Sequence, residues 1–228
     1  MKTKKTAGTS FEIALSKFVE PAAILTRVSD EDEKVRQAVS SLGARHYHEK
    51  QRKLTASRLM NYKGFAKNYF IKGNFYNHIP AQKIVKLIGP LFFEYEKVCI
   101  HREPLDFLIS MYFWGKKYRN DISFKDWVLH NRNIIHENYF IAPVEGPFKV
   151  DNIIYFDELK KETFKFDMLG NEFAEELRKN SFKSGLRPKK LPHPMIFFEN
   201  HKLKKEAEEI RDEIQSKYGL NFKYPEIS

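Results

Sequence analysis

Hydrophobic residues in this chain follow two patterns, helical spacing over some segments and short unbroken runs over others. Near the N-terminus, Phe11, Ala14, Leu15 and Phe18 fall at i, i+3, i+4 and i+7, which predicts an amphipathic helix that ends before Pro21. In chain order, further helices are expected over Glu33–Leu42, Pro80–Leu87, Leu105–Trp114, Ser123–Ile135, directly after Asp157-Glu158, Phe173–Leu177 and Lys202–Tyr218.

Two short apolar runs, within Lys97–His101 and Val150–Phe156, predict buried strands that are each followed by a helix. Strands that alternate with helices favour an α/β fold with a parallel sheet. The basic segment Arg45–Lys72 has helical stretches without strong periodicity, and Ser181–Pro194 is expected to be a basic loop.

Composition and charge narrow the class of protein. The 228 residues suit a single domain (1–228), and 42% of them are hydrophobic, which indicates a globular chain with a sizeable core. The formal charge of +10 favours anionic partners, although a lysine-rich surface gives the same count. The single cysteine, Cys99, is expected to be buried and inert. Because no apolar run could span a bilayer or act as a secretory signal, we expect a soluble, cytoplasmic protein.

Small and hydroxyl-bearing residues lie just before the first helix. The first N–H groups of a helix have no partner within it and can bind an anion. The segment is therefore a candidate phosphate cradle, formed by Lys5, Thr6, Ala7, Gly8, Thr9 and Ser10. A simple helix cap is the alternative.

Two segments are more specific together than either is alone. Lys5-Thr6-Ala7-Gly8-Thr9-Ser10 resembles the loop with which sulfotransferases bind the 5′-phosphosulfate of 3′-phosphoadenosine 5′-phosphosulfate (PAPS). Arg102-Glu103-Pro104-Leu105-Asp106, followed by Ser110 and Tyr112, resembles their second motif, which holds the 3′-phosphate through the Arg and the Ser. The carbohydrate branch of the family includes the uronyl 2-O-sulfotransferases, and Asn77-His78-Ile79 sits where that branch has its catalytic histidine. Asp157-Glu158-Leu159 looks like the family's Glu-x-Leu element.

The resemblance implies a three-layer fold of the P-loop NTPase type, with helices on both sides of a central parallel sheet. It implies that PAPS is the donor and that the acceptor is a hydroxyl group of a carbohydrate, which can be anionic. No metal cofactor and no nucleic-acid partner are expected. Lys5 and His78 would be the catalytic residues. The nucleotide would be held by Lys5, Thr6, Ala7, Gly8, Thr9, Ser10, Arg102, Ser110, Arg187 and Lys189, the last two from the late basic loop. A bend after Pro104 would bring Arg102 and Ser110 to one phosphate.

The chain departs from the family pattern in two places. A buried strand usually leads into the first loop, whereas only Met1-Lys2-Thr3 precede Lys4 here. We therefore expect that strand to be missing or reduced to a stub, and the loop to be less rigid. Phe107 stands where the second motif usually has a basic residue.

The residues alone leave several alternatives open. His46 or His48 could replace His78 as the general base, since any neutral imidazole can accept a proton near neutral pH. An Asp or Glu is a further alternative, because other sulfotransferases use a carboxylate. A P-loop kinase or NTPase is a second function, but the chain lacks Gly-x-x-x-x-Gly-Lys-Ser/Thr. A third possibility is a non-catalytic protein that binds nucleic acid or another polyanion, and only the net charge supports it. A fourth is an inactive remnant of a sulfotransferase, which would follow from loss of the first strand.

Overall fold

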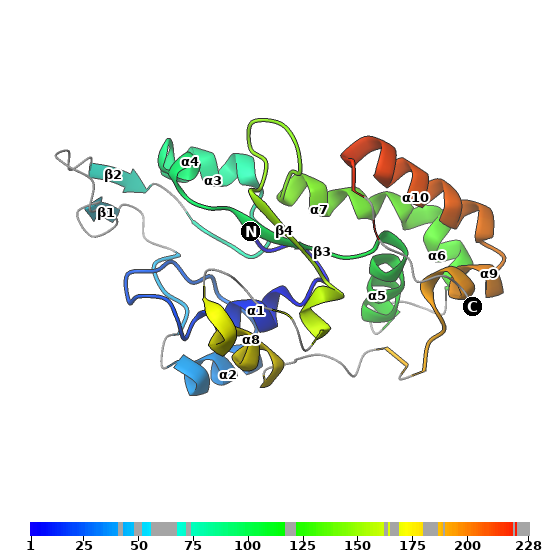
Figure 1. Cartoon of the computed structure of the whole chain (residues 1–228), viewed down its shortest axis with the longest axis horizontal. Coiled ribbons are helices and arrows are strands. Elements are labelled where there is room, and N and C mark those ends of the chain that lie inside the picture. The colour runs from blue at the N-terminus through cyan, green and yellow to red at the C-terminus, as the bar shows by residue number, and fades with distance from the viewer. Residues whose placement is uncertain are drawn as a thin grey trace.

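Helices dominate the computed structural model, and a short pair of parallel strands lies among them (Figure 1). The structure describes residues 1–40, 43–47, 52–55, 68–71, 74–116, 122–161, 164, 169–179, 187–188, 190–220 and 222. The elements are α1 (Gly8–Leu15), α2 (Asp30–Ser40), β1 (Arg52–Thr55), β2 (Asn68–Ile71), α3 (Ala81–Ile88), α4 (Leu91–Glu94), β3 (Val98–His101), α5 (Pro104–Lys116), α6 (Phe124–Asn131), η2 (Arg132–Ile135), α7 (His136–Ile141), β4 (Asn152–Tyr155), η3 (Glu158–Lys160), α8 (Gly170–Lys179), α9 (Pro194–Asn200) and α10 (Lys204–Tyr218).

Strands β3 and β4 pair in parallel, with Cys99 opposite Ile153 and Ile100 opposite Ile154. Because successive residues of a strand face opposite sides, Ile100 and Ile154 pack with α1 and α8, whereas Cys99 packs against Ile141 of α7. Helices therefore lie on both faces of the pair, as Figure 1 shows. The predicted α/β character is confirmed, although the parallel sheet has only two strands within the described residues.

The largest apolar cluster lies among α5, α6, α9 and α10. It contains Leu105, Leu108 and Ile109 of α5, all of which are fully buried. These residues fix one side of α5 in the core. Another set of α5 positions, which includes Ser110 and Trp114, lines a cleft.

The residues that precede α1 lie along β3. The amino group of Met1 donates to the Val98 carbonyl, and the Thr3 hydroxyl donates to the Ile100 carbonyl. Thr3 and Thr6 are each 1% exposed, and their Oγ atoms lie 2.8 Å apart. Residues 1–3 are not a strand, but these buried contacts hold the loop against β3.

Most of the predicted helices are present, although their ends are shifted. They could be predicted because the spacing of apolar residues that indicates a helix is a local feature of the sequence. Gly219 ends α10 with a φ of 63°, as a helix-ending glycine does. Two predictions are wrong. Arg52–Thr55 and Asn68–Ile71 are antiparallel strands rather than helical stretches. The helix expected after Asp157 is only the 3₁₀ turn η3. Helix α9 was not predicted, and it begins at Pro194, where the basic loop was expected to end.

Candidate functional site

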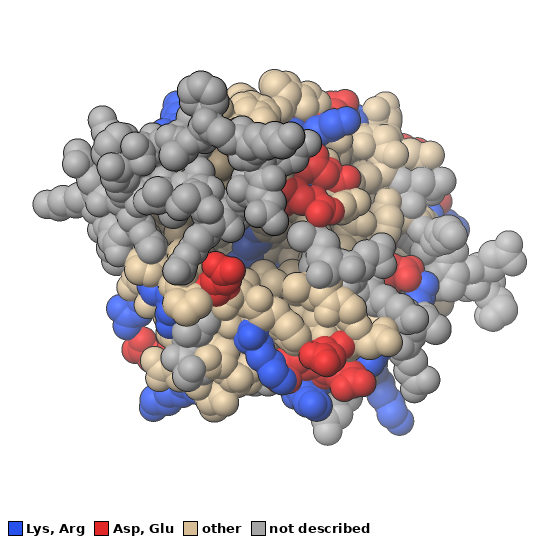
Figure 2. Space-filling model, turned by 60° about the vertical axis from the view of Figure 1, so that its left-hand side comes forward, with Lys and Arg blue, Asp and Glu red and all other residues tan. Residues whose placement is uncertain are grey.

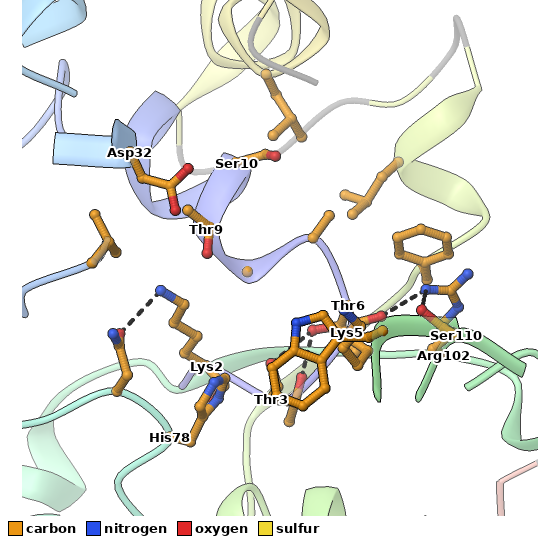
Figure 3. Close-up of a pocket in the computed structure, with 18 of the residues that line it drawn as sticks. Lys2, Thr3, Lys5, Thr6, Thr9, Ser10, Asp32, His78, Arg102 and Ser110 are labelled. Carbon is orange, nitrogen blue, oxygen red and sulfur yellow. Dashed lines mark hydrogen bonds between the residues drawn. The ribbon is translucent and has the colours of Figure 1, made fainter. Parts of the chain in front are cut away.

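A cleft of about 700 Å³ lies where the loop before α1 meets α5 and the start of α2. Its lining includes Lys5, Thr6, Ala7, Gly8, Thr9, Ser10, His78, Arg102, Ser110 and Arg187, which are all the predicted site residues that the structure describes. Lys189, the remaining one, lies outside the described residues. Figure 2 shows a hollow with Lys or Arg atoms inside it and acidic side chains beside it. In Figure 3, Arg102 and Ser110 lie at one end of the cleft and Lys2 and His78 at the other.

The loop before α1 has an unusual backbone. Lys5 and Ala7 both have a φ of 57°, in the left-handed region, which costs a residue with a side chain roughly 1–3 kcal/mol. Ala7 is the N-cap of α1 and makes no side-chain capping hydrogen bond, so the simple helix cap is not formed. A Cβ atom at Gly8 would lie 2.8 Å from Cγ of Lys2, so a side chain here would push Lys2 aside. Left-handed turns before a helix aim backbone N–H groups into a concavity that suits an anion.

Arg102 connects this loop to α5. Its Nη1 donates to the Lys5 carbonyl at 2.8 Å and to Oγ of Ser110 at 3.2 Å, and its guanidinium lies over the Phe156 ring at 4.2 Å. Arg102 and Ser110 do meet, as expected, but the predicted bend after Pro104 is wrong. The chain turns between the end of β3 at His101 and the start of α5 at Pro104, and α5 then continues as one helix to Lys116. Within the described part of the chain, no hydrogen bond is made by Nη2 of Arg102, so this group can serve a ligand.

Asp106 holds two arginines at the same end of the cleft. Its carboxylate accepts from Nε of Arg102 and, at 2.7 Å, from Nη1 of Arg187. Burial alone would raise the pKa of Asp106, but the two guanidinium groups outweigh burial and lower that pKa below its ordinary value. Asp106 is therefore an ion-pair partner of Arg102.

His78 is positioned by the backbone of the N-terminal segment. Its Nδ1 lies 3.0 Å from the Lys2 carbonyl. A carbonyl can only accept, so Nδ1 carries the proton and Nε2 has the free lone pair. Burial lowers the pKa of His78, which keeps the ring neutral at pH 7. Of the alternative bases, His46 contacts the Pro21 carbonyl and does not line the cleft, and His48 lies outside the described residues.

A partly buried ionic network lies at the His78 end of the cleft. Glu12 of α1 accepts from Lys2 at 2.6 Å and from Arg36 of α2 at 3.2 Å, and Lys2 also donates to Asn77 at 3.0 Å. Lys2 lines the cleft, and Asp32, at the start of α2, does so as well. Sequence patterns do not identify these residues, because each contact joins segments that are far apart in the chain.

Lys5 makes a second contact inside the cleft. Its Nζ lies 5.2 Å from the ring centroid of Trp114, which is 45% exposed and lines the cleft. A cation–π contact at such an exposed indole contributes about 0.5–1 kcal/mol.

Two other features bear on the chemistry. Burial raises the pKa of the Cys99 thiol to about 12, as expected for an inert cysteine. Among the residues that the structure describes, no group of three or more His, Cys, Asp and Glu side chains could hold a metal ion, and no helix is long and apolar enough to cross a membrane.

Comparisons of the chain with protein-family models, with curated proteins and with solved structures give no match. The geometry of the cleft is therefore the basis for assigning a function.

Proposed function

We propose that the protein is a sulfotransferase with a P-loop-like α/β fold, which moves a sulfuryl group from PAPS to the hydroxyl group of a carbohydrate. One observation carries the proposal. The loop before α1 and the Arg102–Ser110 pair, which are far apart in the sequence, line the same cleft and are joined by the 2.8 Å hydrogen bond from Arg102 to the Lys5 carbonyl.

The cleft suits a ligand with anionic groups at two places. Arg102, Arg187 and Ser110 form one cationic end, and Lys5 with the N–H groups at the start of α1 forms a second. The volume of about 700 Å³ falls within the range of roughly 300–1,000 Å³ that is usual for small-molecule sites. PAPS carries a 3′-phosphate and a 5′-phosphosulfate, so its charges match this arrangement.

When bound, PAPS supplies a sulfuryl group whose bond to the 5′-phosphate oxygen breaks as the acceptor oxygen bonds to sulfur. Such a transfer needs mainly positioning and charge stabilisation from the protein. Lys5 and the backbone N–H groups of the loop stabilise the negative charge that grows on the leaving phosphate. Nε2 of His78 accepts the hydroxyl proton, since the hydrogen bond at Nδ1 leaves Nε2 unprotonated.

The test combines binding with transfer. Calorimetric titration with 3′-phosphoadenosine 5′-phosphate should show binding, and ³⁵S-labelled PAPS should transfer sulfate to a glycan in a panel of acceptors. His78→Ala should reduce transfer by roughly 10²–10⁴-fold and leave nucleotide binding intact. His46→Ala is the matched control, because His46 lies outside the cleft.

Three results would contradict the proposal. The first is no binding of the nucleotide, and the second is full transfer activity in His78→Ala, which removes His78 from the mechanism. The third is hydrolysis of ATP with Mg²⁺ in place of sulfate transfer, which favours an NTPase. Binding to DNA or heparin that falls steeply with salt and does not respond to the nucleotide favours a polyanion-binding protein instead.

A further inference from the structure

His78 lies at an unusual place in the backbone. The N–H of Ile79 donates to the Tyr76 carbonyl at 3.2 Å, which closes a four-residue turn, and His78 is the third residue of this turn with a φ of 61°. A turn with a positive φ at its third residue usually has glycine or asparagine there. A histidine is strained in this conformation, and such strain persists only where the surroundings hold the residue. The contacts around the turn therefore decide where the imidazole lies.

A main-chain group orients the imidazole ring. Nδ1 of His78 lies 3.0 Å from the Lys2 carbonyl, and Figure 3 shows the two residues beside each other at this end of the cleft. Lys2 belongs to the N-terminal segment, which forms no strand. Its carbonyl can orient the ring only if Lys2 is itself held in place.

Asn77 joins Lys2 to the turn. Its Oδ1 accepts from the Lys2 ammonium at 3.0 Å, and its Nδ2 donates to the Arg27 carbonyl. The same ammonium donates to Glu12 of α1 at 2.6 Å. Two neighbouring residues of the turn thus bond to the two ends of Lys2, Asn77 to its ammonium and His78 to its carbonyl. These contacts fix the imidazole relative to α1 and to the loop that precedes it.

We propose that Asn77 is a positioning residue, whose side-chain amide clamps the 76–79 turn to the N-terminal segment and so holds the imidazole of His78 in place for proton transfer. The inference rests on the proposed sulfotransferase function, because Asn77 acts through the base of that reaction. Misplacing a reacting group by about 1 Å costs roughly 10²-fold in rate. Without the amide of Asn77, the strained turn is free to relax, and Nε2 of His78 is no longer held in one position.

Steady-state kinetics at pH 8, where the imidazole is neutral, test the positioning. Asn77→Ala should lower kcat by about 10- to 100-fold. The KM for PAPS and the Kd for 3′-phosphoadenosine 5′-phosphate should stay within about threefold of the wild-type values, a change of less than about 0.7 kcal/mol. Asn131→Ala is the matched control, because Asn131 also donates to a backbone carbonyl, that of Trp127 at 2.9 Å, and does not line the cleft. The control should keep the wild-type kcat.

The pH–rate profile gives a readout that a purely structural role would not move. Burial lowers the pKa of His78, and the charged groups that act on the ring are Lys2, Lys4 and Glu12. Asn77→Ala removes none of these charges. A ring that is released from its place is better hydrated, so the midpoint of the acid limb should rise towards about pH 6.5 in this variant.

Thermal unfolding tests the strained turn without any substrate. His78→Gly should melt about 2–4 °C above His78→Ala, because both lack the imidazole and only alanine keeps a Cβ atom in the left-handed conformation. His46 has a φ of 57° and lies outside the cleft, so it provides the matched pair. His46→Gly should likewise melt above His46→Ala, with transfer retained in both. Equal melting temperatures for the two His78 variants overturn the inference, since the turn then places no constraint on the base.

A second variant covers the case in which Asn77→Ala does not fold. Asn77→Asp keeps an oxygen for the Lys2 ammonium and loses only the donor to the Arg27 carbonyl. Its kcat at pH 8 should still fall by about threefold or more, because one of the two attachments of the turn is gone.

The outcomes separate this inference from the function on which it rests. A folded Asn77 variant with the wild-type kcat and an unchanged acid limb overturns the positioning role and leaves the sulfotransferase function standing. A large loss of nucleotide affinity in Asn77→Ala, with kcat unchanged, assigns Asn77 to nucleotide binding and also overturns the positioning role. No binding of the nucleotide to the wild-type protein contradicts the sulfotransferase function, and this inference with it.

Discussion

Replacing Arg102 with lysine should weaken the binding of 3′-phosphoadenosine 5′-phosphate by about 30- to 1,000-fold. In the structure, Nε and Nη1 of Arg102 bond to Asp106, Lys5 and Ser110, while no hydrogen bond joins Nη2 to any of the described residues, and Arg102 lines the cleft. A hydrogen bond to a charged group contributes about 1.5–3 kcal/mol. Lysine keeps the charge but loses the planar fork, so one or two such bonds are lost, and a loss of about 2–4 kcal/mol corresponds to this range of Kd.

Effects on folding must be separated from effects on binding. Arg102→Ala removes one partner of a buried ion pair, a change that costs about 3–5 kcal/mol when no other partner remains. Arg187 stays bonded to Asp106, so the cost here should lie below that range. Arg102→Lys is the milder variant, because it leaves a cation near Asp106. Arg132→Lys is the matched control, since Arg132 makes an exposed ion pair with Glu209 away from the cleft.

Isothermal titration calorimetry at one fixed salt concentration measures the affinities, and thermal unfolding checks that each variant is folded. The control should bind the nucleotide as the wild type does. A folded Arg102→Lys protein whose Kd lies within about threefold of the wild-type value would falsify the assignment of Arg102 as a phosphate ligand. An equal loss in Arg132→Lys would show that the binding depends on net charge rather than on the cleft.

Three further predictions concern other residues. Burial lowers the pKa of His78, and a general base must be neutral to accept a proton. The transfer rate should therefore fall as the pH drops, and the midpoint of this fall should lie below about pH 6.5. A midpoint above this value in the pH–rate profile would contradict His78 as the base. Arg36→Ala should lower the free energy of unfolding by about 3–5 kcal/mol in denaturant titrations, because fully buried Arg36 bridges Glu12 and Glu33; a change below about 1 kcal/mol would show that the network contributes little. Cys99 should resist thiol reagents in the folded protein and react in denaturant, since it is buried and its pKa is about 12; rapid labelling of the native protein would argue against this packing.

Local sequence patterns predicted the parts of the fold that local interactions determine. Phe11, Ala14, Leu15 and Phe18 pack together on one side because their spacing puts them there, and all four join the cluster around α1 and α8. Helix α7 was missed because it continues almost directly from η2, so no polar break separates it from the predicted Ser123–Ile135 helix. Segments whose apolar residues lack a clear period, such as β1 and β2, could not be assigned in the same way.

The site was predicted where a motif is contiguous and missed where the contacts are long-range. Motif residues such as Lys5 and Arg102 line the cleft as expected. Lys2 and Trp114 were not predicted as site residues. Lys2 is held in the cleft by its contacts with Glu12 and Asn77, and Trp114 lies there because of the position of α5. No spacing in the sequence encodes such contacts, since they depend on how the elements pack.

The way the first loop is held explains how it can keep a costly backbone although residues 1–3 do not form a strand. Two left-handed residues, Lys5 and Ala7, would relax if the loop were free to move. Buried Thr3 and Thr6 fix one side of the loop on β3, and Arg102 fixes the other through the Lys5 carbonyl. The same guanidinium thus holds the loop and lines the cleft, so the two proposed anion-binding ends are aligned before a ligand arrives. A preformed arrangement loses little freedom on binding, which is the condition under which backbone N–H groups stabilise a transition state effectively.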